Sequence, residues 1–115
     1  MNRCVVQRDE SILFSDVKIA DHFAARLIGL LKTAGLNENQ GLLLNKCSQI
    51  HTFGMKFSID AIFLSKDGEI LHIEKALAPG KVSPHISKTV WVLEVRSGSC
   101  DRLKIDLNQQ LTISQ

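Results

Sequence analysis

The sequence feature that most constrains the fold is a pair of apolar runs on either side of an Asp-Gly dipeptide. The run "SIDAIFL" precedes the turn residues "SKDG" at 65–68, and "EILHIEKAL" follows them. An Asp-Gly pair between apolar runs is a strong short-range signal for a β-hairpin, because the tight turn needs residues that tolerate positive φ. The sequence therefore predicts an antiparallel strand pair in the middle of the chain.

Most of the remaining chain also has the pattern of short strands bounded by turn residues. Segments 4–7 and 11–14 form a predicted N-terminal hairpin, and 17–20 continues it as extended chain. "TVWVLEVRS" and "DRLKIDL" flank residues 97–100 as another predicted hairpin, "GLLL" is a buried strand, and "QLTIS" is a closing strand. Between these parts, "APGKVSPHISK" is a predicted loop, long enough to be functional.

One amphipathic helix is predicted in "DHFAARLIGLLKTAGL". Its core-facing residues recur at helical spacing and are Phe23, Leu27, Leu30, Leu31 and Ala34. Asp21 suits the N-cap, and Gly35 suits a left-handed turn at the C-terminal end. Arg26 borders the apolar arc, so its stem can pack there while its guanidinium reaches toward the sheet.

These elements predict a single domain, residues 1–115, of the α+β class and mostly β. We expect the helix to pack on a twisted, largely antiparallel sheet, which closes in part into a small β-barrel. A chain of 115 residues can bury about two thirds of its unfolded surface. Its composition, 44% hydrophobic and 23% charged, excludes the disordered class.

The charge, the apolar runs and the cysteines of the sequence limit the kinds of partner and the compartment that we expect. The 14 basic residues exceed the 12 acidic ones by a net charge of +2 and are mostly scattered, so we expect no nucleic-acid partner. The sequence has neither a signal-peptide pattern nor a run near the ~20 apolar residues of a membrane span, so we expect no membrane partner and a cytoplasmic location. The three cysteines are far apart and lack a C-x-x-C pair, which favours reduced thiols.

The stretch "IHTFGMKFSID" is the candidate binding region because it mixes ionisable and large apolar residues. Alternation places its odd-numbered residues on the core and Asp60 where exposure gives way to burial. We expect a bend at Gly54, with Phe53 and Met55 closing one wall of a shallow pocket, His51 at its rim and Asp60 near its floor.

Asp60 at that boundary needs a partner, and Arg26 is the predicted one. Glu94 alternates with the core-facing residues of its strand, and it would approach Asp60 if the two strands were neighbours. Crowded carboxylates are one way to obtain a proton donor near neutral pH. The alternative is a structural ion pair for Asp60 and a solvated strand face for Glu94.

Cys47 and His51 have i, i+4 spacing, but the surrounding "NKCSQIHTF" lacks a helical period. A zinc site would need two further ligands from the distant His72, His85 and Cys100. The sequence therefore predicts neither a metal site nor a cofactor.

"ARLIGLL", "CSQIHTFGMKFSIDAIFLSKDGEI" and "VWVLEVRSG" are similar to successive blocks of the family known as domain of unknown function 192. The family occurs in bacteria and archaea, and the resemblance implies a compact, mainly β domain with a helix and no established reaction, ligand or partner. By motif position, it resembles the family's helix signature at Arg26 and Gly29 and its strand carboxylate at Asp60. Its aromatic-Met segment corresponds to residues 51–55, and its late strand and turn to Glu94 and Gly98.

Two functions follow from these residues. The favoured hypothesis is a non-enzymatic accessory module that binds a small molecule or peptide in a groove beside His51, Phe53, Met55 and loop 78–88. The alternative is a small hydrolase or lyase with His51 as general base.

In the alternative, Asp60 or Glu94 would act as the acid or orient the histidine. An extended chain holds His51 and Asp60 far apart, so this reaction needs a sharp bend between them. The binding module does not require His51 and Asp60 to act on the same atom of a substrate.

Overall fold

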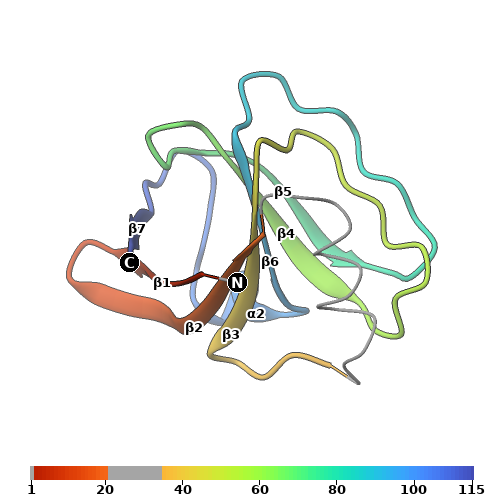
Figure 1. Cartoon of the computed structure of the whole chain (residues 1–115), viewed down its shortest axis with the longest axis horizontal. Helices are drawn as coiled ribbons and strands as arrows, with labels where there is room; N and C mark the ends of the chain where they lie inside the picture. Colours follow the sequence, from red (N-terminus) through yellow and green to blue (C-terminus); the bar gives the residue numbers. More distant parts are fainter. Residues whose placement is uncertain (1, 21–34) are drawn as a thin grey trace.

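The predicted sheet is present, and it is strongly curled. The computed structural model describes residues 2–20 and 35–115. Within them, seven strands form one sheet in the order β5-β4-β6-β3-β2-β1-β7 (Figure 1). The strands are β1 (Arg3–Arg8), β2 (Ser11–Ala20), β3 (Gln40–Asn45), β4 (Ile59–Leu64), β5 (Ile70–Leu77), β6 (Trp91–Arg96) and β7 (Thr112–Ser114). Neighbouring strands are antiparallel except β2 and β3, which run parallel.

The N-terminal and central hairpins are confirmed. β1 pairs with β2, and β4 pairs with β5 across the turn that contains Gly68. Gly68 has φ 88, which lies in the left-handed region that favours glycine. A Cβ on Gly68 would lie 2.1 Å from the backbone oxygen of Leu111, so the turn also needs a residue without a side chain.

That close approach belongs to a latch, residues 108–111, which joins the two edges of the sheet. At the start of the edge strand β5, Ile70 N donates to Gln109 O at 2.9 Å and Leu111 N donates to Gly68 O at 2.9 Å. The chain then continues into β7, which pairs with β1 at the other edge. The sheet is therefore a curled half-barrel whose edges are tied together by the latch.

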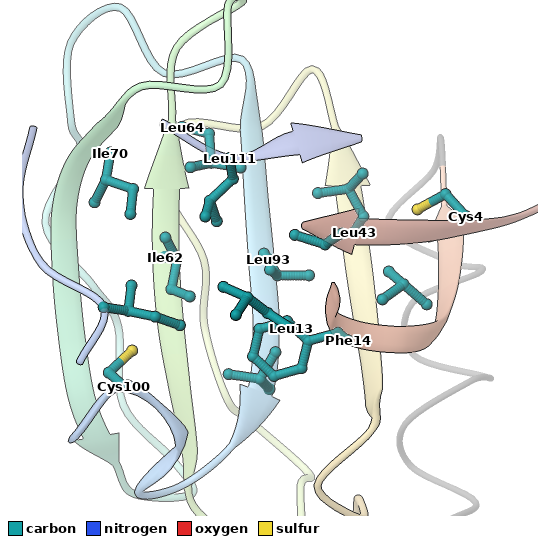
Figure 2. Packing of buried hydrophobic residues seen from close by; sticks show 14 residues of the cluster. Cys4, Leu13, Phe14, Leu43, Ile62, Leu64, Ile70, Leu93, Cys100 and Leu111 are labelled. Carbon is teal, nitrogen blue, oxygen red and sulfur yellow. The ribbon is translucent and has the colours of Figure 1, made fainter. Parts of the chain in front are cut away.

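Side chains are buried on both faces of the curled sheet. The inner core lies inside the half-barrel (Figure 2) and consists of Cys4, Val6, Leu13, Phe14, Val17, Leu43, Ile62, Leu64, Ile70, Leu93, Val95, Cys100, Ile105 and Leu111. The outer core lies on the opposite face and consists of Ala20, Leu42, Leu44, Ile50, Met55, Ile59, Ala61, Phe63 and Val92. Segments 46–58 and 78–90 cover part of the outer core, with Ile50, Met55 and Ile86.

β4 differs from the predicted alternation because both of its faces are covered. All six of its residues are buried. The odd-numbered Phe63 and its neighbours face the outer core, and the even-numbered Ile62 and Leu64 face the inner core. Asp60 shares the even register and is 1% exposed, so it lies in the interior and not at a boundary with solvent. Alternation within β4 did not predict this, because the outer cover comes from residues outside the strand, in segments 46–58 and 78–90.

The predicted strand at 101–107 is wrong. After β6 the chain turns at Gly98, which has φ 95, into the short helix α2 (Ser99–Arg102). The backbone N–H groups of Gly98 and Cys100 both donate to the carboxylate of Asp60, and this contact curls the chain away from β6. The closing strand predicted in "QLTIS" is present as β7.

The amphipathic helix predicted over residues 21–35 lies outside the described residues except for its last position, Gly35. Among the described residues, no helix is both long enough and apolar enough to cross a lipid bilayer.

Candidate functional site

One end of the half-barrel is sealed around the Asp60 carboxylate. Its Oδ1 accepts a hydrogen bond from Ala76 N at 2.9 Å. Its Oδ2 accepts hydrogen bonds from Gly98 N at 3.1 Å and Cys100 N at 2.9 Å. Charge-assisted hydrogen bonds of this kind allow a carboxylate to lie in an apolar interior. Asp60 therefore joins β4 to the end of β5 and to the turn before α2, which we call the sealed end.

The sealed end also changes the chemistry of a neighbouring thiol. The pKa of Cys100 is raised from 9.0 to about 12, first by burial and then by the charge of Asp60 and a hydrogen bond with it. Burial alone raises the pKa of Cys4 to about 11. Both thiols are therefore protonated and poorly reactive near neutral pH. Cys4, Cys47 and Cys100 are free cysteines in the structure, and Cys4 and Cys100 are buried.

The opposite end of the half-barrel is open. β2 and β3 end there and β6 begins there, so that Ile19, Asn45 and Trp91 surround the same opening. The 65–68 turn and the residues from the latch to the C-terminus complete the rim. Together they line an open cavity of about 600 Å³, which is within the usual range for a small-molecule site. We call this the open end.

The lining of this cavity combines one aromatic surface with several amides. Trp91 supplies the aromatic surface, and the amide side chains are those of Asn2, Asn45, Gln110 and Gln115. Lys66 and Asp67 contribute one charge of each sign. Gln110 Nε2 donates to the backbone oxygen of Asp67 at 2.7 Å, and this contact orients one amide. The open end therefore offers both donors and acceptors next to an indole ring.

This cavity was not predicted from the sequence. Trp91 alternates with Glu94 on its strand, so the sequence pattern placed it among the core-facing residues, and no role was predicted for the amides. Trp91 does share the face of the inner core, but it stands at the first position of β6, where the core meets the opening. The sequence does contain one signal that could have predicted the cavity. It has a single tryptophan at the end of one strand and amide side chains at the ends of other strands.

The bend predicted at Gly54 is confirmed. Gly54 has φ 80, and β4 begins only after this turn. Met55 is 7% exposed in the outer core, whereas Phe53 is 51% exposed, so these two side chains do not close one wall together. His51 stacks on Phe53 with ring centroids 4.7 Å apart, and its Nδ1 accepts a hydrogen bond from Phe53 N at 3.3 Å.

Two buried hydroxyls, which were not predicted from the sequence, fix this bend against the 78–90 loop. Thr52 Oγ1 accepts a hydrogen bond from Lys81 N at 2.9 Å, and Thr52 N donates to Lys81 O at 2.8 Å. Ser83 Oγ accepts a hydrogen bond from Ile50 N at 3.0 Å. A threonine and a serine in loop-like sequence give no sign of burial, because their partners are backbone atoms of a distant segment.

Glu94 is fully buried, and its position corrects two predictions. In the pairing of β4 with β6, Asp60 lies opposite Val95 and Ala61 lies opposite Glu94. Successive side chains of a strand point to opposite faces, so Asp60 faces the inner core and Glu94 faces the outer core. The hypothesis that these carboxylates crowd each other is therefore wrong, and the solvated strand face proposed for Glu94 is wrong as well.

Two ionisable side chains of β5, His72 and Glu74, form a pair on the outer face of the sheet. His72 Nε2 and Glu74 Oε2 are 3.1 Å apart, and the His72 ring packs edge-on against Phe63 with centroids 5.3 Å apart. Glu74, Ala61 and Glu94 follow one another across three neighbouring strands, so the two glutamates have an alanine between them. The described residues contain no group of three or more His, Cys, Asp or Glu side chains arranged to hold a metal ion.

Arg26 lies outside the described residues, and so does its predicted pair with Asp60. The three backbone donors already explain how the Asp60 carboxylate is accommodated in the interior. The binding roles predicted for Arg26, His51, Phe53, Met55, Asp60 and Glu94 stay predictions.

One curled sheet, sealed at one end and open at the other, defines this molecule as a mostly β half-barrel protein of the α+β class. The comparison with known families agrees with the resemblance noted in the sequence. The chain belongs to the DUF192 family, described as an uncharacterized ACR, whose family model matches residues 4–113. No curated protein sequence matches the chain.

Two solved structures share the fold. A protein of unknown function from Novosphingobium aromaticivorans has a TM-score of 0.80 at 20% identity, over 96% of this chain and 83% of that one. A protein from Sinorhizobium meliloti, described provisionally as a transcription regulator, has a TM-score of 0.78 at 20% identity, over 96% of this chain and 92% of that one. At this level of identity the likeness shows the fold alone.

Proposed function

We propose that the protein is a non-enzymatic module that binds a small polar molecule at the open end of the half-barrel. The observation that carries this proposal is the cavity of about 600 Å³ that places Trp91 among side-chain amides. Ligand sites are commonly found in the mouths of β-barrels, where the strands hold the lining residues and the opening admits the ligand.

The lining favours an uncharged ligand with one apolar face and several hydroxyl or amide groups. Lys66 and Asp67 carry opposite charges, so the rim does not select strongly for a cation or an anion. The indole face of Trp91 suits a ring with exposed C–H groups, and the amides can donate to and accept from hydroxyls. A sugar or another polyol ring has this chemistry.

The geometry lends less support to the hydrolase or lyase alternative. His51 lies in the 46–58 segment, the Asp60 carboxylate is occupied by three backbone donors, and Glu94 faces the outer core. These residues belong to different parts of the structure, and a general base and its acid must lie within hydrogen-bond reach of one reacting group.

The cytoplasm remains our expected compartment, and three cysteines without a disulfide support it, because thiols persist in a reducing environment. The partner that we propose for the open end is a small molecule, and we propose neither nucleic acid nor a membrane as a partner there.

Trp91 is the single tryptophan of the chain, and its fluorescence therefore tests the proposal directly. We expect a saturable change in Trp91 emission when the protein is titrated with a panel of monosaccharides, polyols and nucleosides. Calorimetry on the same ligand should show that Gln110→Ala weakens binding about tenfold, the effect of losing one well-made hydrogen bond. Gln7→Ala, a matched change on β1 outside the cavity lining, should leave the affinity unchanged.

If no compound of the panel changes the emission, or if Gln7→Ala and Gln110→Ala weaken binding equally, the open end is not the binding site.

A further inference from the structure

The charges of this chain are segregated in a way that its small net charge conceals. Segments 46–58 and 78–90 contain the four lysines Lys46, Lys56, Lys81 and Lys88 and no Asp or Glu. All 12 acidic residues of the chain therefore lie elsewhere. Scattered cations normally alternate with anions on a globular surface, so two segments free of acidic residues are a distinct feature.

The fold places these two segments side by side (Figure 1). Five backbone hydrogen bonds join them along their length: Cys47 N to Val90 O at 3.1 Å, Ile86 N to Ser48 O at 3.0 Å, Ser83 N to Ile50 O at 2.9 Å, Thr52 N to Lys81 O at 2.8 Å and Gly80 N to Thr52 O at 3.0 Å. We call residues 46–58 and 78–90 together the basic ribbon. Lys46 and Lys88 lie near one end of these bonds, and Lys56 and Lys81 near the other.

The basic ribbon has an anchored side and a displayed side. Ile50 and Met55 are buried in the outer core, and the hydroxyls of Thr52 and Ser83 are occupied by backbone partners. In contrast, Phe53 is 51% exposed and Val82 is 55% exposed, and Lys56, Lys81 and Lys88 are exposed as well. His51 on one segment pairs with Val82 on the other and stacks on Phe53. Phe53 and Val82 therefore both lie next to His51, in the part of the ribbon where Thr52 bonds to Lys81.

We propose that the basic ribbon is a docking surface for an acidic segment of a partner protein, with one apolar side chain of that segment seated on Phe53 and Val82. Charge complementarity carries the choice of partner, because the ribbon offers cations without a competing anion of its own. The apolar pair supplies the anchor that charges alone do not.

The aromatic content of the ribbon favours a peptide over single-stranded nucleic acid. Proteins that bind single strands stack successive bases on several aromatic side chains. Among the described residues, Phe14 and Phe63 are buried and Phe57 is half-buried, so the ribbon exposes one phenylalanine, Phe53, and one further ring, the smaller imidazole of His85. One face of the Phe53 ring is already covered by His51. A single half-covered phenylalanine ring suits one apolar anchor better than a row of bases.

The probe for this proposal is a short fluorescein-labelled peptide of glutamates with one central leucine, followed by fluorescence anisotropy with the full chain. We expect saturable binding that weakens steeply as salt is added, because exposed charges are screened. The double variant Lys56→Glu/Lys81→Glu should weaken binding by at least tenfold. The matched control Lys18→Glu/Lys104→Glu makes the same change of charge away from the ribbon and should alter the affinity less than about twofold.

A second variant tests the apolar anchor. Phe53→Ser should weaken binding of the leucine peptide about tenfold and leave the weaker binding of an all-glutamate peptide unchanged. Phe53 is exposed, so this variant should unfold at the same urea concentration as the parent protein, and the comparison does not depend on a change of fold.

Four results would overturn the proposal. The first is an equal loss of peptide binding in the ribbon double variant and the control double variant. The second is tighter binding of oligothymidylate than of the peptide, and the third is binding to anionic lipid vesicles without binding to the peptide. The fourth is an association of the protein with itself that depends on the ribbon and replaces peptide binding. The ribbon is separate from the open end, so Trp91 titrations and peptide anisotropy fail or succeed independently.

Discussion

The two ends of the half-barrel both contain polar groups, but at the sealed end these groups are buried and hydrogen-bonded to each other, whereas at the open end they line a cavity. At the sealed end, the polar groups satisfy each other, since one carboxylate accepts three backbone hydrogen bonds in the interior. At the open end, amides, a lysine and an aspartate surround a cavity of about 600 Å³. A satisfied buried polar network specifies one structure, whereas polar side chains that line an opening can also contact a ligand. The residues of the sealed end therefore stabilise the fold, and those of the open end are the ones that we propose to contact a ligand.

The largest expected effect is at the sealed end. Asp60→Ala leaves the N–H groups of Ala76, Gly98 and Cys100 without their acceptor, and it should lower the free energy of unfolding by about 4 kcal/mol. Urea denaturation followed by Trp91 fluorescence measures this. A loss below about 1 kcal/mol would mean that the carboxylate is not the anchor of this end.

The next effect tests the latch between the two ends. Gly68→Ala puts a Cβ within 2.1 Å of Leu111 O at a residue with φ 88, so we expect a loss of about 3 kcal/mol from strain and lost latch contacts. Gly80 is the matched control, because it has φ 79 and a Cβ added to it would meet nothing within 4 Å. Gly80→Ala should cost only the conformational strain, about 1 kcal/mol. Equal losses in thermal or urea unfolding would show that the close approach to Leu111 has no energetic weight.

The third effect depends on pH. The pKa values of Cys100 and Cys4 are raised to about 12 and about 11 in the folded chain, from 9.0. Above pH 9.0 the unfolded chain loses thiol protons that the folded chain keeps, so stability should fall as the pH rises from 9.0 toward these values. Each thiol contributes up to about 1.4 kcal/mol per pH unit in this range.

The chain has no tyrosine that would titrate in the same interval. Urea unfolding at a series of pH values should show a flatter decline for Cys4→Ala/Cys100→Ala than for the parent protein. Removing Cys100 alone should flatten the profile more at the upper end of the range than removing Cys4 alone, because burial and then Asp60 raise the pKa of Cys100 to about 12, above the value of about 11 for Cys4. Identical slopes in the parent and the double variant would contradict the buried thiols as the cause.

The smallest effect on stability is at the open end. Asp67→Ala removes an exposed carboxylate from the cavity rim, and it should change the free energy of unfolding by less than about 1 kcal/mol. Under the proposed function it should still weaken ligand binding, as measured by Trp91 emission. If Asp67→Ala destabilised the protein as much as Asp60→Ala, the distinction between the two ends would be lost.

The local parts of the fold could be predicted from the sequence, and the parts that depend on distant segments could not. Asp67-Gly68 specified its hairpin because the turn chemistry lies within a few residues. The burial of both faces of β4 depends on segments 46–58 and 78–90, which alternation within β4 does not report. In the same way, the strand predicted at 101–107 failed because the Asp60 carboxylate, far away in sequence, binds the turn at Gly98.

The candidate site follows the same division. Gly54 was correctly predicted to bend the chain, because its need for positive φ is local. The need of Asp60 for a partner was also correctly inferred, but the described partners are backbone N–H groups, which carry no sequence signal. The cavity beside Trp91 was missed because it is made by the ends of several strands, and their order in the sheet is not visible in a single sequence.

Both ends of the described chain lie beside the cavity, since Asn2 and Gln115 are among its lining residues. An affinity tag fused to either end would therefore stand over the opening and compete with a ligand for access. Binding measurements need protein from which such a tag has been removed. The same placement also makes a sensor feasible, because a donor and an acceptor fluorophore fused to the two ends would flank the cavity and report its occupancy by energy transfer.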